Sequence, residues 1–125
     1  MPWTREELDT LGAADELRLA ALREDGTFGS VVTIWVVRAG DEIVVRSAHG
    51  RTSGWYRRAL GTLAGRIEAD GVVRDVRFEE VPVDEHAPAD AAFHAKYDRY
   101  PEEYVDPVVS PDSWAASLRL VPQDA

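Results

Sequence analysis

The sequence predicts a mainly β fold of the α+β class: a small barrel of six strands, closed or partly split, with short helices at its ends. Several short segments alternate apolar and polar residues with the period of two that is typical of strands. Turn signals made of glycine and acidic residues separate these segments and favour hairpins. At 125 residues the chain is expected to form one domain, which buries about two-thirds of the surface that the unfolded chain exposes.

The chain is expected to begin with a short helix at residues 5–11. Thr4 and Glu7 have the spacing of a capping box, in which each side chain accepts a hydrogen bond from the other residue's backbone N–H. In residues 16–23, leucines and an alanine recur at every second position, which predicts the first strand. A hairpin turn at residues 24–27 is expected to follow.

Residues 31–38 have the composition of a central barrel strand. The run is β-branched and aromatic, with apolar side chains on both faces. A turn at residues 39–42 returns the chain to a third strand at 43–47. A short helix is then expected at residues 54–63, with Ser53 as its N-cap.

A second hairpin and a final strand complete the predicted barrel. Residues 65–69 and 72–81 flank an aspartate followed by a glycine, which is a strong signal for a tight turn. Residues 89–99 have the pattern of an amphipathic helix. Residues 101–113 contain three prolines and little periodicity, so a loop is expected there. Residues 114–121 are predicted to form the last strand.

The composition excludes several classes of function. The chain has no cysteine, which rules out disulfides, thiolate nucleophiles and cysteine metal ligands. Its net charge of -9 opposes binding to nucleic acid or to anionic membranes. The N-terminus lacks the pattern of a signal peptide, and the longest apolar run, residues 31–37, is too short to span a bilayer. We therefore expect a cytoplasmic protein that binds neither nucleic acid nor membrane.

Positive charge is concentrated in the middle third of the chain. Residues 38–77 carry eight cations against five acids, a net charge of +3, whereas the segments before and after them carry -4 and -8. Thirteen of the fourteen cations are arginine, whose planar side chain suits carboxylate and phosphate groups. Arginine-rich usage can equally reflect genomic base composition, so the composition leaves both interpretations open.

Residues 47–60, the candidate stretch, combine the features of a ligand site. A glycine-containing loop with hydroxyls and cations runs into two adjacent aromatic residues, which suits an anionic, planar ligand. The helix start near Gly54 adds unpaired backbone N–H groups and a partial positive charge. With the arginine that precedes the stretch, the candidate binding residues are Arg46, Ser47, Arg51, Ser53, Trp55 and Tyr56.

The same residues also have a purely structural interpretation. Arg46 would then be a solvated strand residue, Trp55 would belong to the core and the loop would have no ligand. His49 is the only histidine in the loop, and it is a candidate for proton exchange with a ligand. No pair of residues in the stretch forms a recognisable catalytic dyad, so the catalytic residues stay unassigned.

A second constellation has the spacing of a metal site. His86, Asp90 and His94 are four residues apart, which places them on one face of a straight helix. Pro88 interrupts that helix between the first two. We therefore expect a solvated acidic face there and no metal site.

Several motifs together resemble a bacterial family known as domain of unknown function 2255, over nearly the whole chain. The motifs are Thr33-Ile34-Trp35-Val36-Val37-Arg38, Val45-Arg46-Ser47, Thr52-Ser53-Gly54-Trp55-Tyr56-Arg57 and Phe93-His94-Ala95-Lys96-Tyr97. More broadly, the order of strand, loop, helix and hairpin is similar to that of the FMN-binding split-barrel proteins. These include the pyridoxamine-phosphate-oxidase-like proteins and the deazaflavin-dependent nitroreductases and quinone reductases.

This resemblance implies a homodimer that holds FMN or a deazaflavin in a groove between its subunits. It implies that the ring system lies near Thr33 and Trp35, with the candidate stretch as a wall of the pocket. Arg46 and Arg51 would hold anionic groups, and Ser47 would donate hydrogen bonds together with Ser53. The implied activity is that of an oxidoreductase that transfers hydride to a small organic acceptor.

The loop at residues 23–30 departs from the deazaflavin-binding pattern. In those relatives the loop carries a basic, glycine-containing motif that grips phosphate, whereas this chain has Glu24 and Asp25 there. The departure favours an alternative in which the same barrel and dimer bind a small anionic or tetrapyrrole ligand without catalysis.

Overall fold

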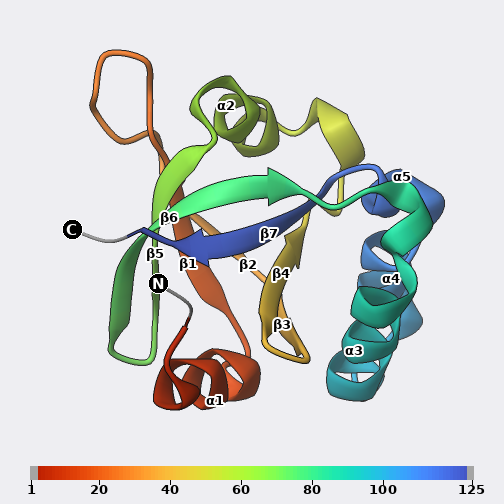
Figure 1. Cartoon of the computed structure of the whole chain (residues 1–125). Coiled ribbons are helices and arrows are strands. Elements are labelled where there is room, and N and C mark those ends of the chain that lie inside the picture. The colour runs from red at the N-terminus through yellow and green to blue at the C-terminus, as the bar shows by residue number, and fades with distance from the viewer. Residues whose placement is uncertain (1–2, 124–125) are drawn as a thin grey trace.

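The computed structural model describes residues 3–123, which form one seven-stranded antiparallel sheet that curls into a nearly closed barrel (Figure 1). The strands are β1 (Leu17–Ala21), β2 (Val32–Ile34), β3 (Val36–Ala39), β4 (Glu42–Arg46), β5 (Ala64–Ala69), β6 (Val72–Glu80) and β7 (Ser117–Pro122). Their order in the sheet is β2-β1-β5-β6-β7-β4-β3. The two ends of the sheet, β2 and β3, are consecutive in the chain, so one continuous segment closes the barrel.

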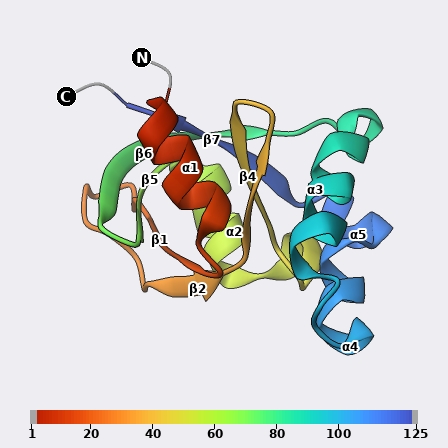
Figure 2. The same cartoon turned by 90° about the horizontal axis from the view of Figure 1, so that it is seen from below.

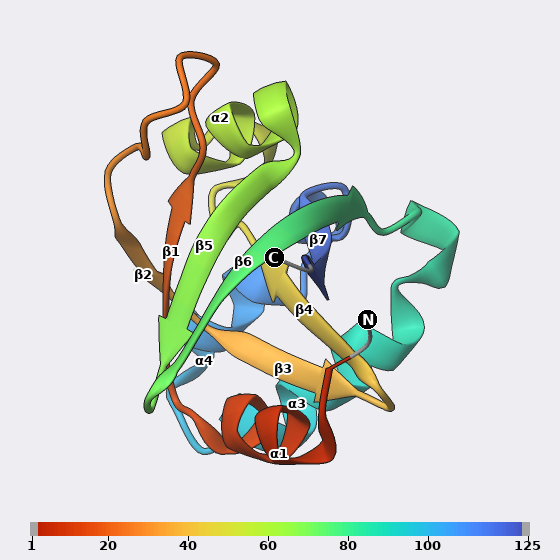
Figure 3. The ribbon, with the colours of Figure 1, turned by 60° about the vertical axis from the view of Figure 1, so that its left-hand side comes forward.

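Helices cover the two ends and one side of this barrel (Figures 1 and 2). They are α1 (Arg5–Ala13), α2 (Gly54–Thr62), α3 (Ala87–Tyr97), α4 (Glu102–Val105) and α5 (Pro111–Trp114), with 3₁₀ turns η1 (Gly50–Thr52), η2 (Val83–Glu85) and η3 (Asp106–Val108). α1 and α2 lie at opposite ends of the barrel (Figure 3), and α3 to α5 lie along its side (Figure 1). The predicted split-barrel class with flanking helices is therefore confirmed.

Local signals in the sequence determine the helix ends. Thr4 Oγ1 accepts a hydrogen bond from the Glu7 N–H at 3.1 Å, and Glu7 Oε1 accepts one from the Thr4 N–H at 3.0 Å, which confirms the capping box. Leu63 ends α2 in the left-handed conformation at φ +56°, and its N–H donates to the Ala59 carbonyl at 2.7 Å. α2 therefore has nearly the bounds that the sequence predicts.

Two apolar clusters pack on opposite faces of β3 and β4. Val36, Ile43 and Val45 point into the barrel, where they meet the buried leucines of β1 and β7. Val37 and Val44 point outward and pack against Phe93 and Tyr97 of α3. This packing explains why the sequence is apolar on both faces of these strands, since neither face is in contact with water.

Trp35 interrupts the segment that the sequence predicts as one continuous strand. β2 pairs with β1 and β3 pairs with β4, so the prediction of a single strand at residues 31–38 is wrong and the sheet has seven strands instead of six. The Tyr97 hydroxyl of α3 accepts a hydrogen bond from the Val36 N–H at 3.1 Å. Lys96 Nζ donates to the Val36 carbonyl at 2.6 Å. Side chains of α3 thus provide hydrogen bonds to the Val36 backbone at the break between β2 and β3.

The same Tyr97 hydroxyl reaches the linker between α1 and β1. It lies 2.8 Å from the Asp15 carbonyl oxygen and 3.0 Å from the Val36 carbonyl oxygen, and it can donate its proton to either. Its ring is fully buried and stacks on Trp35 with the centroids 4.0 Å apart. One side chain therefore joins three segments at the point where the barrel closes.

The C-terminal quarter differs from the prediction in one more respect. Residues 101–113, expected to be a loop, form α4, η3 and the start of α5, and the strand predicted at residues 114–121 begins only at Ser117. A proline at the first or second position begins both η3 and α5, where its missing N–H costs no intrahelical hydrogen bond. Val105 and Val108 are buried against the outer face of β4, so tertiary packing stabilises these short turns.

Replacing Tyr97 with phenylalanine tests the role of its hydroxyl. Y97F keeps the stacked ring but removes the acceptor of the buried Val36 N–H, so we expect a loss of roughly 1–3 kcal/mol in the free energy of unfolding. Urea denaturation followed by tryptophan fluorescence measures this change. Y100F is the control, because Tyr100 is partly exposed and its hydroxyl contacts only Arg99, at 3.4 Å. Equal stability of the two variants would contradict this role.

Candidate ligand site around helix α2

The candidate stretch forms the connection from β4 to α2 at one end of the barrel. Gly50 begins η1 at φ +69°, a conformation that favours glycine, and packs close to Asp112 of α5. Ser53 is the N-cap of α2, but its side chain makes no capping hydrogen bond. The helix start predicted near Gly54 is therefore present, and the Ser53 hydroxyl is not used to cap it.

Arg46 is a structural residue inside the protein, and its charge is not available to a ligand. Its guanidinium group is fully buried and forms an ion pair with Asp90. It also donates to Ser117 Oγ at 2.9 Å and to the carbonyls of Val108 at 2.8 Å and His86 at 3.1 Å. Neither sequence interpretation, ligand contact or solvated strand residue, describes this position. The reason is that α3, which supplies Asp90, packs over the end of β4.

The next residues of the stretch lie in the core. Trp55 and Tyr56 pack in the barrel interior with their rings edge to face, 5.8 Å apart. Ser47 is buried, and its hydroxyl has no hydrogen-bond partner among residues 3–123. The structural interpretation of Trp55 therefore holds, and neither ring is exposed to a ligand in this structure.

Arg51 lies at the rim and is held by the protein. Its guanidinium group donates to Glu80 at 3.1 Å and to the Ala115 carbonyl at 2.8 Å, and about half of its side chain is exposed. The Tyr56 hydroxyl lies 3.4 Å from both acceptors. Burial raises the pKa of Tyr56 to about 12, so this phenol stays protonated at physiological pH.

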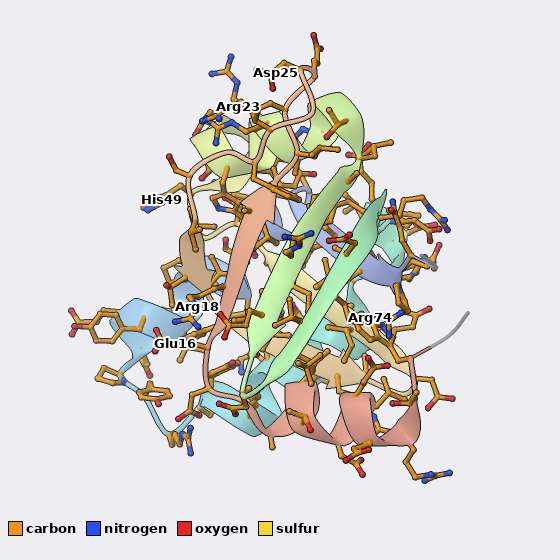
Figure 4. All side chains as sticks on the ribbon, turned by 90° about the vertical axis from the view of Figure 1, so that its left-hand side faces the viewer. Glu16, Arg18, Arg23, Asp25, His49 and Arg74 are labelled. Carbon is orange, nitrogen blue, oxygen red and sulfur yellow. The ribbon has the colours of Figure 1, made fainter. Side chains whose placement is uncertain are left out.

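The remaining candidates lie on different parts of the surface. Thr33 lines a polar cavity of about 520 Å³ with acidic residues of the α1–β1 linker and the β5–β6 hairpin. Trp35 is half-buried against Tyr97. His49 is exposed on the loop after β4. In Figure 4 it lies apart from Arg18 and Glu16, which line the same cavity as Thr33. The predicted binding residues therefore do not line one pocket within a single subunit.

A cationic groove lies between α2 and the loop that follows β1. Arg23, Arg57 and Arg58 line this cavity of about 480 Å³ together with Gly61 and Thr62. Thr62 Oγ1 donates to the Leu22 carbonyl at 2.7 Å, which ties α2 to the end of β1. Within residues 3–123, the Arg57 and Arg58 guanidinium groups form no hydrogen bond or ion pair. These two arginines belong to the candidate stretch but were not among the predicted binding residues.

The groove also contains two acidic residues, Glu24 and Asp25. Asp25 Oδ1 accepts hydrogen bonds from the Thr27 N–H at 2.9 Å and from Thr27 Oγ1 at 2.6 Å, and these bonds lower the pKa of Asp25. Arg23 donates to the Phe28 carbonyl at 2.8 Å. The turn is thus closed by its own side chains, and Figure 4 shows Arg23 and Asp25 at the α2 end of the barrel.

An apolar cavity adjoins the cationic groove on the outer face of β1, β5 and β6. It has a volume of about 330 Å³ and includes the exposed side chains of Phe28, Val31 and Val73. Gly29 lies where the two cavities meet, since a Cβ atom there would be only 2.5 Å from Arg58 Cδ. A side chain at position 29 would displace the Arg58 side chain from this position, and the close approach places a cation at the edge of the apolar face.

The three side chains with metal-ligand spacing, His86, Asp90 and His94, have different partners. His86 precedes α3 and stacks on Trp114, His94 contacts Asp98 at 2.9 Å, and Asp90 binds Arg46. In the part of the chain that the structure describes, no group of three or more histidine, aspartate and glutamate side chains could hold a metal ion. Within the same residues, every helix is too short or too polar to cross a membrane.

The antiparallel sheet that closes through Trp35, with helices at its ends, defines a split-barrel protein. Solved structures with this fold include the haem storage protein HutZ from Vibrio cholerae (16% identity, TM-score 0.66, 100% of this chain and 93% of that one). An FAD-binding protein from Mesorhizobium loti (19%, TM-score 0.65, 99% and 93%) and an F420 reductase (18%, TM-score 0.55, 99% and 97%) are also similar. Identities this low establish the fold alone.

The chain belongs to the family described as "Uncharacterized protein conserved in bacteria (DUF2255)", which matches residues 7–120. This result confirms the family that the sequence motifs suggested. A search of curated proteins finds no significant match to the sequence.

A matched pair of variants tests the structural role of Arg46. R46M leaves the partly buried Asp90 carboxylate without its cation, so we expect a loss of about 3–5 kcal/mol in the free energy of unfolding, or a failure to fold. R51M removes the ion pair with Glu80, in which both side chains are about half exposed. We expect it to cost about 1 kcal/mol or less in the free energy of unfolding. Thermal and urea unfolding measure both. A stable, fully folded R46M variant would show that the buried network is dispensable.

Proposed function

We propose that the protein is a homodimeric split-barrel oxidoreductase that binds FMN or a deazaflavin and transfers hydride to a small organic acceptor. The observation that carries this proposal is the cationic groove, where Arg57 and Arg58 have no protein partner among the described residues and border an apolar surface. A phosphorylated, planar cofactor has an anionic group for the arginines and an apolar ring system for the neighbouring surface. The similar structures of an FAD-binding protein and an F420 reductase support the proposal.

In this proposal the anionic group of the cofactor is held by Arg57 and Arg58, with Arg23 on the opposite side of the groove. Two guanidinium groups offer charge-assisted hydrogen bonds in a geometry that matches phosphate oxygens. Glu24 and Asp25 of the loop oppose an anion there, so three arginines stand against two carboxylates in the groove. The positive charge that the loop lacks in comparison with deazaflavin-binding relatives is therefore supplied by α2.

The apolar part of the cofactor would lie at the edge of the neighbouring face, which Gly29 and Arg58 connect to the groove. Hydride chemistry belongs to the cofactor, so the protein needs only to orient it and to exclude water. In this proposal the Ser53 hydroxyl, which makes no capping bond to α2, donates to the ligand. Trp35 and Thr33 would reach this ligand only from the partner subunit.

The partner subunit would cover the outer face of β1, β5 and β6. Val31 and Val73 are more than half exposed there, which is unusual for two neighbouring valines on a monomer surface. The ion pairs of Arg18 with Glu68 and of Arg66 with Asp75 lie on the same face. Charges of both signs around an apolar centre are self-complementary, as a two-fold symmetric interface requires.

Cofactor titrations test the proposed site. We expect FMN or oxidised F420 to bind to the purified protein, followed by absorbance and flavin fluorescence. R57A and R58A should each weaken binding by about 1.5–3 kcal/mol, or roughly tenfold or more, because each removes a charge-assisted contact. R77A is the control for net charge, since Arg77 is an exposed residue of β6 paired with Glu79. Loss of affinity that is equal in all three variants would place the anion elsewhere.

Oligomeric state tests the dimer independently of the cofactor. V31D and V73D should convert the protein to monomers in sedimentation equilibrium, because each buries a charge in the proposed interface. V83D is the matched control, since Val83 is equally exposed but belongs to η2 on the other side of the molecule. A wild-type protein that sediments as a monomer at high concentration would refute the dimer while leaving the groove proposal open to its own test.

The alternative, a non-catalytic binder of a small anionic or tetrapyrrole ligand, shares the same barrel. The similarity to the haem storage protein favours it. Titration with haemin under the same conditions distinguishes the two: a Soret band that shifts on binding, together with no binding of either flavin-type cofactor, would replace the oxidoreductase proposal with this one.

A further inference from the structure

Lys96 is the only lysine in a chain with fourteen cationic side chains. It lies on the last turn of α3, next to Tyr97, and its amine donates to the Val36 carbonyl at 2.6 Å. The amine also lies 5.1 Å from the centre of the Tyr97 ring. Within residues 3–123 it forms no ion pair with a carboxylate. A lysine that is bonded to a backbone carbonyl and to no acid differs from an ordinary surface cation.

The side chain of Lys96 forms one wall of a cavity of about 440 Å³ between α1, β3 and α3. Most of the lining is apolar and comes from Leu8, Gly12, Ala13, Val37, Ala92 and Ala95. The polar side chains at the cavity are Asp9 and Arg38, which bind each other at 2.8 Å. Arg38 also donates to the Gly40 carbonyl, so the cavity offers few free polar groups other than the Lys96 amine.

The surroundings of Lys96 make its neutral form more accessible than that of an ordinary lysine. Burial lowers the pKa of Lys96 to about 8, and the positive charge of Arg99 acts in the same direction, while Asp15 opposes it. Arg38 adds a further cation at the cavity, partly offset by Asp9. A neutral amine that donates one N–H to the Val36 carbonyl keeps its lone pair for another partner. Such an amine is a nucleophile near neutral pH.

We propose that this cavity binds a small apolar aldehyde, which forms a reversible imine with Lys96. Nζ adds to the carbonyl carbon of the aldehyde, and the resulting carbinolamine loses water to give the C=N bond. The carbonyl oxygen and both amine protons leave as that water, so no oxidant or reductant is consumed, and the Val36 carbonyl keeps the Tyr97 hydroxyl as its donor. An aldehyde fits because the lining is mainly apolar and Arg38 is already paired with Asp9.

The cavity is distant from the proposed cofactor site. It is bounded by α1, at the end of the barrel opposite to α2 (Figures 1 and 2). The imine proposal therefore does not depend on cofactor binding, and either can fail without the other.

Reductive trapping tests the imine. The folded protein is treated with propanal and cyanoborohydride at pH 8, and peptide mass spectrometry separates propylated Lys96 from the N-terminal amine. A pKa near 8 instead of about 10.4 makes the neutral fraction of the amine on the order of 100-fold larger, so we expect trapping at Lys96 to be at least tenfold faster in folded protein than in urea. Equal rates, or labelling of the N-terminus alone, would overturn the proposal.

Two variants at Ala92, one helical turn before Lys96, separate the chemistry from simple access. A92E places a carboxylate beside the amine and should raise its pKa, so trapping should slow several-fold relative to A92Q, which has the same size without the charge. Circular dichroism checks that both are folded. If both variants react at the wild-type rate, the special environment of Lys96 does not control its reactivity and the proposal is wrong.

Discussion

Closure of the barrel at Trp35 is the constraint on which the rest of the structure depends. The segment that contains β2 and β3 has to pair with β1 on one side of Trp35 and with β4 on the other. A strand that changes partners leaves backbone groups unpaired at the change, and buried groups of this kind are costly. The Tyr97 hydroxyl and the Lys96 amine provide these bonds, so α3 is part of the barrel and not an appendage to it.

The position of α3 also determines which surfaces remain available. It covers the outer face of β3 and β4 with Phe93 and Tyr97, and through Asp90 it engages the buried Arg46. The opposite outer face, on β1, β5 and β6, has no such cover within the described chain and exposes Val31 and Val73. One half of the barrel exterior is thus covered by helices of the same chain, and the other half is exposed in the described structure.

Electrostatics around α2 follow from the same arrangement. Although the net charge is -9, three arginines converge on one groove because α2 lies against the end of β1. Two carboxylates, those of Glu24 and Asp25, line the same groove. The local potential of such a site depends on which charges are already paired, and the net charge of the chain does not describe it.

The sequence by itself determined what depends on near neighbours. The capping box of Thr4 and Glu7, the hairpin between β5 and β6, the helix start at Ser53 and the alternating core residues of β1 were all predicted, because turn, cap and period signals act over a few residues. Membership of the family also followed from short motifs.

The tertiary structure alone decided that Trp35 ends a strand, that Arg46 is buried and that Arg57 and Arg58 face Arg23. Each of these depends on a partner far along the chain: Tyr97 is more than 60 residues from Val36 and Asp90 is 44 from Arg46. A local sequence pattern cannot indicate contacts between residues so far apart in the chain, because these contacts form only when the sheet has closed.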